Sequence, residues 1–317
     1  MSGTAETIVM TEKAYKAPNF DFMGQRRIAV ILTLLLTLGS LFAIFTRGFN
    51  FGIDFTGGAM VELGFKQPAN VDEVRAKLEA SEFGNATVQL FGTPNEVLVR
   101  LPPQHDTAAA QISERILALV PDAEMRRIEF VGPQVGEELA EDGALAMLLA
   151  IGGIFVYVML RFTWKFSVGA IAATLHDIII TLGYFAVTQA DFDLTVLAAV
   201  LTVLGYSLND TVVVFDRVRE NLRRERKKSV VETINGAINQ TLSRTIITAG
   251  ETFMVVVALF YFGGELLRNF SIALLIGIFV GTYSSIYVAT ATVAALGISR
   301  QDMLPVQKEG AAVDDRP

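Results

Sequence analysis

The sequence contains no cysteine and only two histidines, His105 and His176, in 317 residues. The absence of cysteine excludes disulfide bonds, thiolate metal sites and cysteine nucleophiles. The chain also lacks a P-loop, an HExxH helix and a GxSxG turn, which are local signatures of nucleotide binding, zinc peptidases and serine hydrolases. We therefore predict that the chain is not an enzyme and that it uses no cofactor, no metal ion and no nucleic-acid partner.

Charged residues are scarce at 19% of the chain, whereas 52% of the residues are hydrophobic. This composition is typical of a polytopic α-helical membrane protein. Six apolar stretches predict six transmembrane helices, at residues 28–46, 144–160, 166–188, 194–215, 245–262 and 270–297. The stretch 144–160 would be only about 25 Å long as a helix, so it needs flanking residues or local thinning to span. The first stretch predicts a retained anchor rather than a signal peptide, because a long polar segment precedes it.

Lysine and arginine gather on one side of this topology. They are Arg26 and Arg27, Arg161 and Lys165, seven residues between 217 and 228, and Arg300. The short opposite connections, 189–193 and 263–269, carry only Arg268, so the positive-inside rule predicts cytoplasmic termini. The predicted organisation is a cytoplasmic segment 1–27, helix 28–46, a non-cytoplasmic domain 47–143, helices within 144–297 with a cytoplasmic loop 217–243, and a cytoplasmic tail 298–317.

The domain after the first helix has a readable pattern. Strands are predicted at 59–65, 86–91, 96–101 and 124–131, and helices at 71–81 and 111–120, with a turn at Gly92-Thr93-Pro94-Asn95. The order βαββαβ predicts a ferredoxin-like domain. This fold serves many functions, so by itself it indicates none. Asp54, which precedes this domain, is interpreted as a turn or capping acid.

Asp210 is the main candidate site residue. It lies within an apolar run, nearer the end of the span than the middle. A charge at the membrane centre costs roughly 2.5–3.5 kcal/mol, so an acid within a span indicates a functional role. Tyr206 lies one turn earlier on the same face, and Asn209 lies beside Asp210. The alternative is an acid that extends to the cytoplasmic interface.

Two charged residues of the fifth span complete this region. Arg244 begins the span, and because the fourth and fifth spans are antiparallel, Arg244 and Asp210 can face each other. Glu251 follows two turns later and about 10 Å deeper. The alternative for Arg244 is an ordinary positive-inside anchor, although the polar turn around it favours a hydrated site.

His176 and Asp177 form a second polar pair, within the third span. Since neighbours in sequence point to different faces of a helix, we expect that the two do not aim at one spot. Asp177 shares a face with Thr174 and Thr181, whose hydroxyls could hydrogen-bond it. A packing contact and a role in proton passage are both open.

The polar segment before the fifth span has its own pattern. Ser229 to Glu232 matches a capping box, and apolar residues recur at helical spacing after it. We predict an amphipathic helix over 230–243 that lies flat on the inner leaflet, beside a basic run that attracts anionic lipid.

The motifs together resemble the SecF family, whose members act with SecD in bacterial protein export. The matching stretches are FGIDFTGG (51–58), VGPQVG (131–136), HDIIITLG (176–183), FDLT (192–195), GYSLND (205–210), DRVREN (216–221), NQTLSRTIITAG (239–250) and GIFVGTYSSIYVA (277–289). The resemblance implies a periplasmic domain after the first of six spans, membership of the RND superfamily and a place in the bacterial inner membrane. It implies a SecD-like subunit, the Sec translocation channel and unfolded exported polypeptide as partners.

The resemblance also implies site residues. The proton-linked aspartate of the family falls on Asp210 and its arginine on Arg244, whereas Glu251 stands where a small residue is expected. Glu251 is open to two interpretations, an additional proton relay or a counter-ion for Arg244. Two alternatives to a proton-driven export subunit remain: half of an RND-type small-molecule exporter, and a structural subunit that carries no protons.

Overall fold

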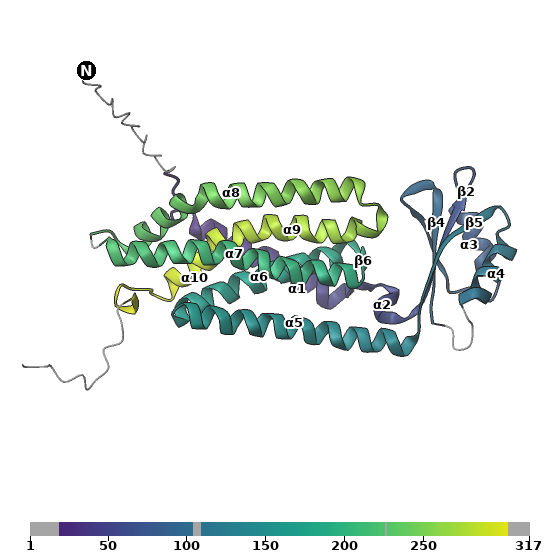
Figure 1. The fold of residues 1–317 in the computed structure, drawn as a ribbon, viewed down its shortest axis with the longest axis horizontal. Coiled ribbons are helices and arrows are strands. Elements are labelled where there is room, and N and C mark those ends of the chain that lie inside the picture. The colour runs from purple at the N-terminus through teal and green to yellow at the C-terminus, as the bar shows by residue number, and fades with distance from the viewer. Residues whose placement is uncertain (1–18, 104–108, 226, 304–317) are drawn as a thin grey trace, which may run out of the picture.

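The computed structural model describes residues 19–103, 109–225 and 227–303, and the remaining residues, His105 among them, lie outside this description. The described chain forms a bundle of long helices with a small sheet domain at one end (Figure 1). The predicted combination of a polytopic helical part with an α+β domain after the first helix is confirmed.

Six helices in the described residues are long and apolar enough to cross a membrane, as predicted. They are α1 (Arg26–Arg47), α5 (Pro133–Arg161), α6 (Trp164–Thr188), α7 (Leu194–Arg224), α8 (Val230–Phe262) and a last one built from η1 (Glu265–Leu267), α9 (Arg268–Ser284), the π-helical η2 (Ser285–Ala289) and α10 (Thr290–Ala295). The stretch 144–160 needs no thinning of the membrane, because its helix begins at Pro133 and is 29 residues long.

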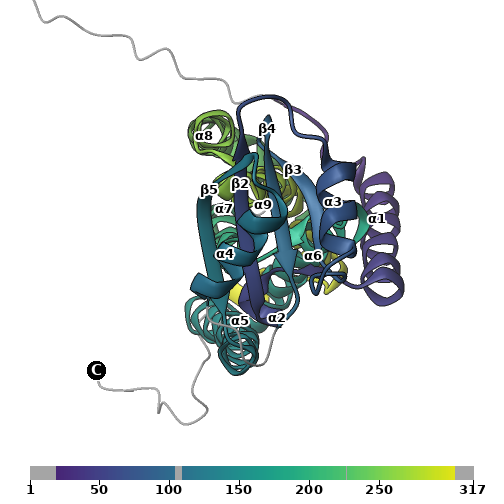
Figure 2. The same ribbon diagram turned by 90° about the vertical axis from the view of Figure 1, so that its right-hand side faces the viewer.

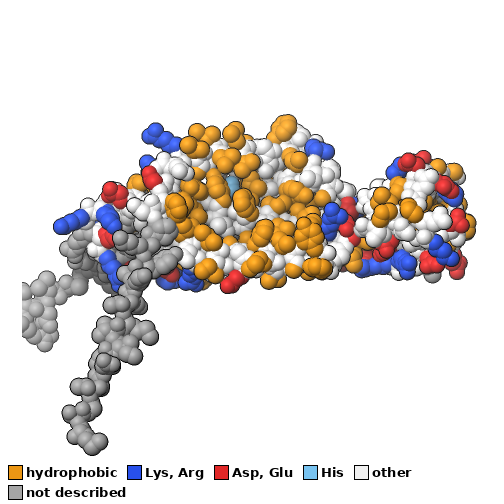
Figure 3. Space-filling model, turned by 90° about the horizontal axis from the view of Figure 1, so that it is seen from above, with side chains coloured by type: hydrophobic (Ala, Val, Ile, Leu, Met, Phe, Trp, Pro, Cys, Tyr) orange, Lys and Arg blue, Asp and Glu red, His pale blue; other side chains and the backbone are white. Residues whose placement is uncertain are grey.

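Helices α6, α7 and α9 form the interior of the bundle. In the most apolar windows of α6 and α7, 56% of the residues are buried, against 6% in α1 and 11% in α5. Small residues allow close approach: a Cβ on Gly277 of α9 would lie 2.1 Å from a methyl carbon of Val203 in α7. Viewed along the bundle, α5 and α8 lie on one side and α1 on the other (Figure 2). Hydrophobic side chains cover much of the bundle surface, and charges gather towards its ends and on the sheet domain (Figure 3).

The sheet domain has the predicted βαββαβ order. It consists of β2 (Gly58–Phe65), α3 (Val71–Glu79), β3 (Thr87–Phe91), β4 (Thr93–Leu101), α4 (Ala109–Leu119) and β5 (Ala123–Val131). The antiparallel strands lie in the order β3-β4-β2-β5, and both helices cover the sheet face turned away from the bundle (Figure 1). The β3–β4 turn is tighter than predicted, because only Gly92, with φ at +68°, separates the two strands.

Three short elements join the two parts, and sequence patterns did not predict them. They are β1 (Asn50–Phe51), α2 (Ile53–Thr56) and β6 (Asp191–Phe192), and β1 pairs with β6 in parallel. Gly57 and Gly58 then lead into β2 with positive φ angles. A Cβ on Gly58 would lie 2.3 Å from the carbonyl oxygen of Leu101, so this crossing requires glycine.

The polar segment between the fourth and fifth spans is mostly helical. Helix α7 extends to Arg224, where ion pairs of Glu220 with Arg217 (2.7 Å) and Arg224 (2.9 Å) follow the helix surface. The capping box at Ser229 is present, as predicted.

The separate surface helix predicted for 230–243 is wrong. These residues form the first part of α8, a continuous helix of 33 residues. Its apolar face packs against the interior of the bundle, where Ile234, Ala237 and Ile238 are buried. The segment before α1 also contacts it, since Phe20 N–H donates to Asn239 Oδ1 at 2.8 Å. The amphipathic pattern therefore reflects protein packing rather than a membrane surface.

Candidate functional site

Asp210 lies on the buried face of α7, with 3% of its surface exposed. Its Oδ2 atom is buried and has no hydrogen-bond partner in the described part of the chain. Buried polar atoms are usually hydrogen-bonded, so an unpaired carboxylate oxygen indicates either a bound water or a site whose proton occupancy changes. The interpretation of Asp210 as an acid extending to the interface does not agree with this burial.

Arg244 is the cation whose charge acts on the Asp210 carboxylate. It lies on α8, which packs against α7, and its side chain is exposed. The described residues contain no ion pair within 4.0 Å between these two side chains. The next residue, Thr245, is buried, and its hydroxyl is also without a partner in the described chain. Among the described residues, the α7–α8 contact therefore contains unpaired polar atoms on both helices, beside a cation for which no ion pair is found.

Asn209 and Glu251 lie away from this contact. Asn209 is exposed on the surface of α7, although it is the sequence neighbour of the buried Asp210. Glu251 is exposed on α8 and forms no ion pair with Arg244 in the part of the chain that the structure describes. The separation of seven positions between Arg244 and Glu251 corresponds to about 10 Å along the helix, which is too far for a direct contact.

The polar contact in α6 differs from the prediction. Asp177 is 1% exposed, and its Oδ1 lies 3.0 Å from His176 Nδ1, so the expectation that these neighbours aim at different spots is wrong. Both side chains can bend along the helix axis, which the helical spacing alone does not show. Thr181 donates to the backbone carbonyl of Asp177 at 2.8 Å rather than to its carboxylate.

The Asp177 carboxylate joins three helices. Its Oδ2 accepts hydrogen bonds from the hydroxyls of Ser207 on α7 and Ser284 on α9, the second at 2.7 Å. Ser207 lies one turn before Asp210 on the same helix, or about 4.5 Å along the axis. The carboxylate of Asp177 on α6 therefore contacts α7 one turn before Asp210. Neither serine could be identified from the sequence pattern, because small residues at helical spacing are also typical of ordinary helix packing.

Asp54 and Asp193 together hold the N-terminus of α7. Asp54 Oδ2 accepts from Leu194 N–H at 3.0 Å, which confirms its interpretation as a capping acid. Asp193 is the N-cap residue, and its Oδ1 accepts from Val196 N–H at 2.9 Å. Burial raises the pKa of Asp193, against the opposing effect of its hydrogen bonds. The helix that carries Asp210 is thus fixed at its start by the FGIDFTGG and FDLT motifs.

An ion pair connects the start of α7 with the sheet domain. Arg100 of β4 lies 2.7 Å from Asp191 of β6, and both side chains are largely buried, at 19% and 23% exposed. Asn50 of β1 also donates to Asp191, at 2.7 Å. Sequence reasoning missed this contact, because the three residues are far apart in the chain and none belongs to a recognisable pattern.

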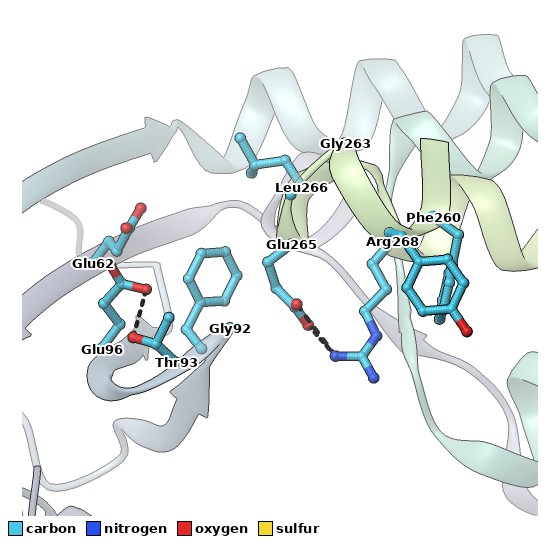
Figure 4. A pocket seen from close by; sticks show the side chains of 12 residues that line it. Glu62, Gly92, Thr93, Glu96, Phe260, Gly263, Glu265, Leu266 and Arg268 are labelled. Carbon is cyan, nitrogen blue, oxygen red and sulfur yellow. Dashed lines mark hydrogen bonds and ion pairs between the residues drawn. The ribbon is translucent and has the colours of Figure 1, made fainter. Parts of the chain in front are cut away.

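A cavity of about 660 Å³ lies between the β3–β4 hairpin and the α8–α9 connection (Figure 4). Glu62 and Glu96 line it on the sheet side. On the helix side Glu265 pairs with Arg268 at 3.0 Å. None of the predicted site residues lines this cavity, and no group of three or more potential metal ligands occurs in the described residues. The cavity is therefore a space between the two parts rather than an extension of the Asp210 region.

Comparison with known proteins agrees with the motifs. The family model described as protein export membrane protein SecD/SecF, C-terminal, matches residues 111–299, and the SecD/SecF GG motif matches residues 42–69. Curated relatives named protein translocase subunit SecF include those of Vibrio alginolyticus, 49% identical over 93% of this chain and 96% of the relative, and Pseudomonas aeruginosa, 49% identical over 95% and 99%. The relative from Escherichia coli O157:H7 is 42% identical over 92% of this chain and 93% of its own length.

A solved structure shows the same fold. The crystal structure of SecDF from Thermus thermophilus, described as a translocon-associated membrane protein, matches with a TM-score of 0.80 and 40% identity. The match covers 88% of this chain and 39% of that chain, so this chain corresponds to about two fifths of the longer protein. The names of the relatives agree with the prediction of a transport subunit rather than an enzyme. The chain is a multi-pass inner-membrane protein and belongs to the SecF branch of the SecD/SecF family of protein export membrane proteins.

Proposed function

We propose that this chain works with a SecD-like subunit beside the Sec translocation channel and uses the proton gradient to complete the movement of unfolded polypeptide across the inner membrane. Asp210 is the group that takes up and releases the proton. The observation that carries the proposal is the burial of Asp210 inside an apolar bundle, with one carboxylate oxygen that has no partner among the described residues. A permanently charged acid at such a place is costly, so exchange between a neutral and an ionised form is the natural behaviour.

Arg244 provides the fixed charge of this site. An arginine stays protonated in proteins, so the net charge of the pair depends only on Asp210. Arg244 acts on Asp210 without an ion pair in the described chain, which leaves room for the two side chains to approach when Asp210 ionises. Moving one charge through the membrane potential provides about 2.3 kcal/mol per 100 mV, enough to shift a two-state equilibrium by more than tenfold.

Contacts at the start of α7 support a proposed path from Asp210 to the sheet domain. Asp210 lies on α7, and the start of α7 is held by Asp54 and lies directly after β6. Asp191 of β6 pairs with Arg100 of the sheet domain. We propose that a shift of α7 on protonation changes the position of the sheet domain, and that this domain grips or releases the polypeptide.

The proposed orientation places both termini in the cytoplasm and residues 47–143 in the periplasm. It follows from the basic residues at the ends of α1, α5, α7 and α10 that lie away from the sheet domain. A periplasmic sheet domain would meet the polypeptide as it leaves the channel. A proton entering from the periplasm would reach Asp210 from the side on which the polypeptide emerges.

The test is the variant Asp210→Asn, which keeps the size of the side chain but cannot ionise. We expect it to assemble with the SecD-like subunit, while export into vesicles with an imposed proton gradient falls to the level seen without the gradient. The matched control is Asp216→Asn on the same helix, where Asp216 pairs with Arg161 at the surface. Gradient-dependent export that survives Asp210→Asn would contradict the proposal. Asp210→Glu should retain part of the activity, whereas a purely structural role would penalise the larger acid as well.

A further inference from the structure

A groove of about 570 Å³ lies between α1, α10 and the start of α8. It is at the end of the bundle away from the sheet domain, where α10 ends and α8 begins (Figure 1). Most of its lining is apolar and consists of Val30, Ile31, Val231, Ala291, Ala294 and Ala295. A space lined by such side chains binds water poorly, so an apolar group is its natural occupant.

The groove exists because α1 is packed loosely against the rest of the bundle. Its buried residues are Ala29 and Ala43. Tyr283 of α9 holds the Ala29 turn by donating to its carbonyl oxygen at 2.9 Å. The next two residues, Val30 and Ile31, are 40% and 59% exposed. The alanine side chains of α10 end at the Cβ atom, so they leave the space beside these two residues open to the surrounding membrane.

Two arginines line one end of the groove. Arg26 and Arg27 are the first two residues of α1, and neither forms an ion pair in the described chain. None of the residues that line the groove is acidic. By contrast, Arg161 at the same end of the bundle is paired with Asp216 at 2.9 Å. The first turn of α1 also lacks an acid, so two cations face the positive end of the helix dipole, and a bound anion would offset this.

The segment before α1 holds the two arginines in position. The N–H groups of Phe20 and Met23 donate to Asn239 Oδ1 at 2.8 Å and to Asn235 Oδ1 at 3.1 Å. The side-chain amides of both asparagines donate back to the Phe20 carbonyl, at 2.8 and 2.9 Å. Asn235 lies one turn after Val231, so this anchor and the groove share one face of α8. The site is therefore formed before a ligand binds, which lowers the cost of ordering it.

Charge and depth together identify the occupant as a lipid. Ile31 lies about 6 Å further along α1 than Arg27, so the groove has a cationic end and an apolar continuation. A phospholipid has the complementary order, with a phosphate group followed by acyl chains. Arginine binds phosphate through two parallel hydrogen bonds, and basic pockets between transmembrane helices bind anionic head groups. A water-soluble anion would contact the arginines but would leave the apolar part of the groove empty.

We propose that this groove binds one anionic phospholipid, with its phosphate between Arg26 and Arg27 and an acyl chain along Ile31 and the alanines of α10. An anionic lipid is favoured over a zwitterionic one, because the two arginines repel the ammonium group of a zwitterionic head. The lipid fills the space between α1 and α10 and fastens the first span, which is otherwise little buried, to the bundle. The inference goes beyond the proposed function and does not depend on proton uptake by Asp210.

The first experiment is native mass spectrometry of the full-length chain in detergent with equal amounts of phosphatidylglycerol and phosphatidylcholine of the same acyl chains. We expect preferential retention of phosphatidylglycerol. The double variant Arg26→Gln/Arg27→Gln should lose about fivefold of this retention for each arginine, the effect of one basic residue near an anionic surface. The matched control, Arg223→Gln/Lys227→Gln, removes two exposed basic residues at the same end that do not line the groove, and it should keep the preference. Equal retention of both lipids by the wild type, or equal loss in both double variants, would overturn the proposal.

The second experiment fills the groove and leaves both arginines in place. Ala295→Phe should lose bound phosphatidylglycerol several-fold, whereas Ala146→Phe, at an exposed position of α5, should not. Thermal unfolding gives an independent measure: phosphatidylglycerol should raise the Tm of the wild type and the Ala146 variant more than that of the Ala295 variant. Undiminished lipid binding by Ala295→Phe, or the same rise in Tm with inorganic phosphate alone, would show that no acyl chain occupies the groove and would overturn the proposal. The comparison of two lipids on the wild type remains decisive if a variant does not fold.

Discussion

The contact between Arg100 and Asp191 allows a quantitative test of how the sheet domain is attached to the helix bundle. Arg100→Ala removes the cation that lies 2.7 Å from Asp191, while Asn50 still donates to the same carboxylate. A hydrogen bond to a charged group contributes about 1.5–3 kcal/mol, and both side chains here are largely withdrawn from water. Since 1.36 kcal/mol corresponds to a factor of ten, the docked arrangement should open about 10- to 150-fold more often in the variant.

Hydrogen exchange at the Gly52 amide measures this opening. Gly52 N–H donates to the carbonyl oxygen of Phe192 at 2.8 Å, next to the β1–β6 pair, so its exchange rate reports separation of the two segments. The double variant of Arg100 and Asp191 should lose little more protection than the Asp191 variant alone, because the loss of Asp191 already removes its ion pair with Arg100.

The matched control is the ion pair of Arg115 with Glu82 on the sheet domain. It has a similar distance of 2.9 Å, but both side chains are about half exposed. An exposed pair of this kind contributes about 0.2–1 kcal/mol, and Arg115→Ala should leave the Gly52 amide unchanged. If Arg100→Ala leaves the protection of Gly52 within twofold of the wild type, the ion pair does not hold the domain and the proposed path from α7 is refuted.

Two further predictions concern single acids outside the transmembrane spans. Asp54→Ala should speed hydrogen exchange of the Leu194 amide about 2- to 30-fold, because a lost helix cap costs roughly 0.5–2 kcal/mol. Asp54→Asn keeps a hydrogen-bond acceptor and is the control. Unchanged exchange in the alanine variant would contradict the capping role. Burial favours a higher pKa for Asp302, but its hydrogen bonds from Lys165 and Ser299 outweigh this and lower it. The ionised Asp302 side chain therefore stabilises the folded protein at pH values above its ordinary pKa of about 4. This stabilisation is lost as the pH falls through the lowered pKa of Asp302 in the folded protein. Amide exchange at Ser299 should distinguish wild type from Asp302→Asn at neutral pH and no longer do so in strong acid, and a difference that grows in acid would contradict the assignment.

Much of the fold could be predicted because its signals are local. Long apolar runs require helices in a membrane, and the alternation and turn residues of 59–131 identify the strands. The capping box at Ser229 was predicted correctly for the same reason. Asp54 was interpreted as a turn or capping acid, but the helix that it caps begins 140 residues later in the chain, which no local signal indicates. The separate helix at 230–243 was wrong because an amphipathic pattern looks the same whether its apolar face meets lipid or protein.

The candidate site was harder to predict, because its contacts join distant parts of the chain. Asp210 could be identified because a charge within an apolar run costs free energy. That its Oδ2 atom has no partner in the described chain could not be predicted. The carboxylate of Asp177 meets Ser207 and Ser284, which are 30 and 107 residues away, and ordinary serines in a membrane helix give no signal of such a contact. His176 reaches Asp177 through side-chain rotation, which helical spacing does not describe.

The single helix α8 has a mechanical consequence. With 33 residues it is about 50 Å long, so it behaves as a lever whose ends cannot move independently. One end holds the segment before α1 through Asn239, and the other lies beside the β3–β4 hairpin. A tilt of about ten degrees around one end displaces the other by about 9 Å. A movement of α8 at one side of the membrane therefore displaces its other end at the opposite side directly, without intermediate side-chain contacts.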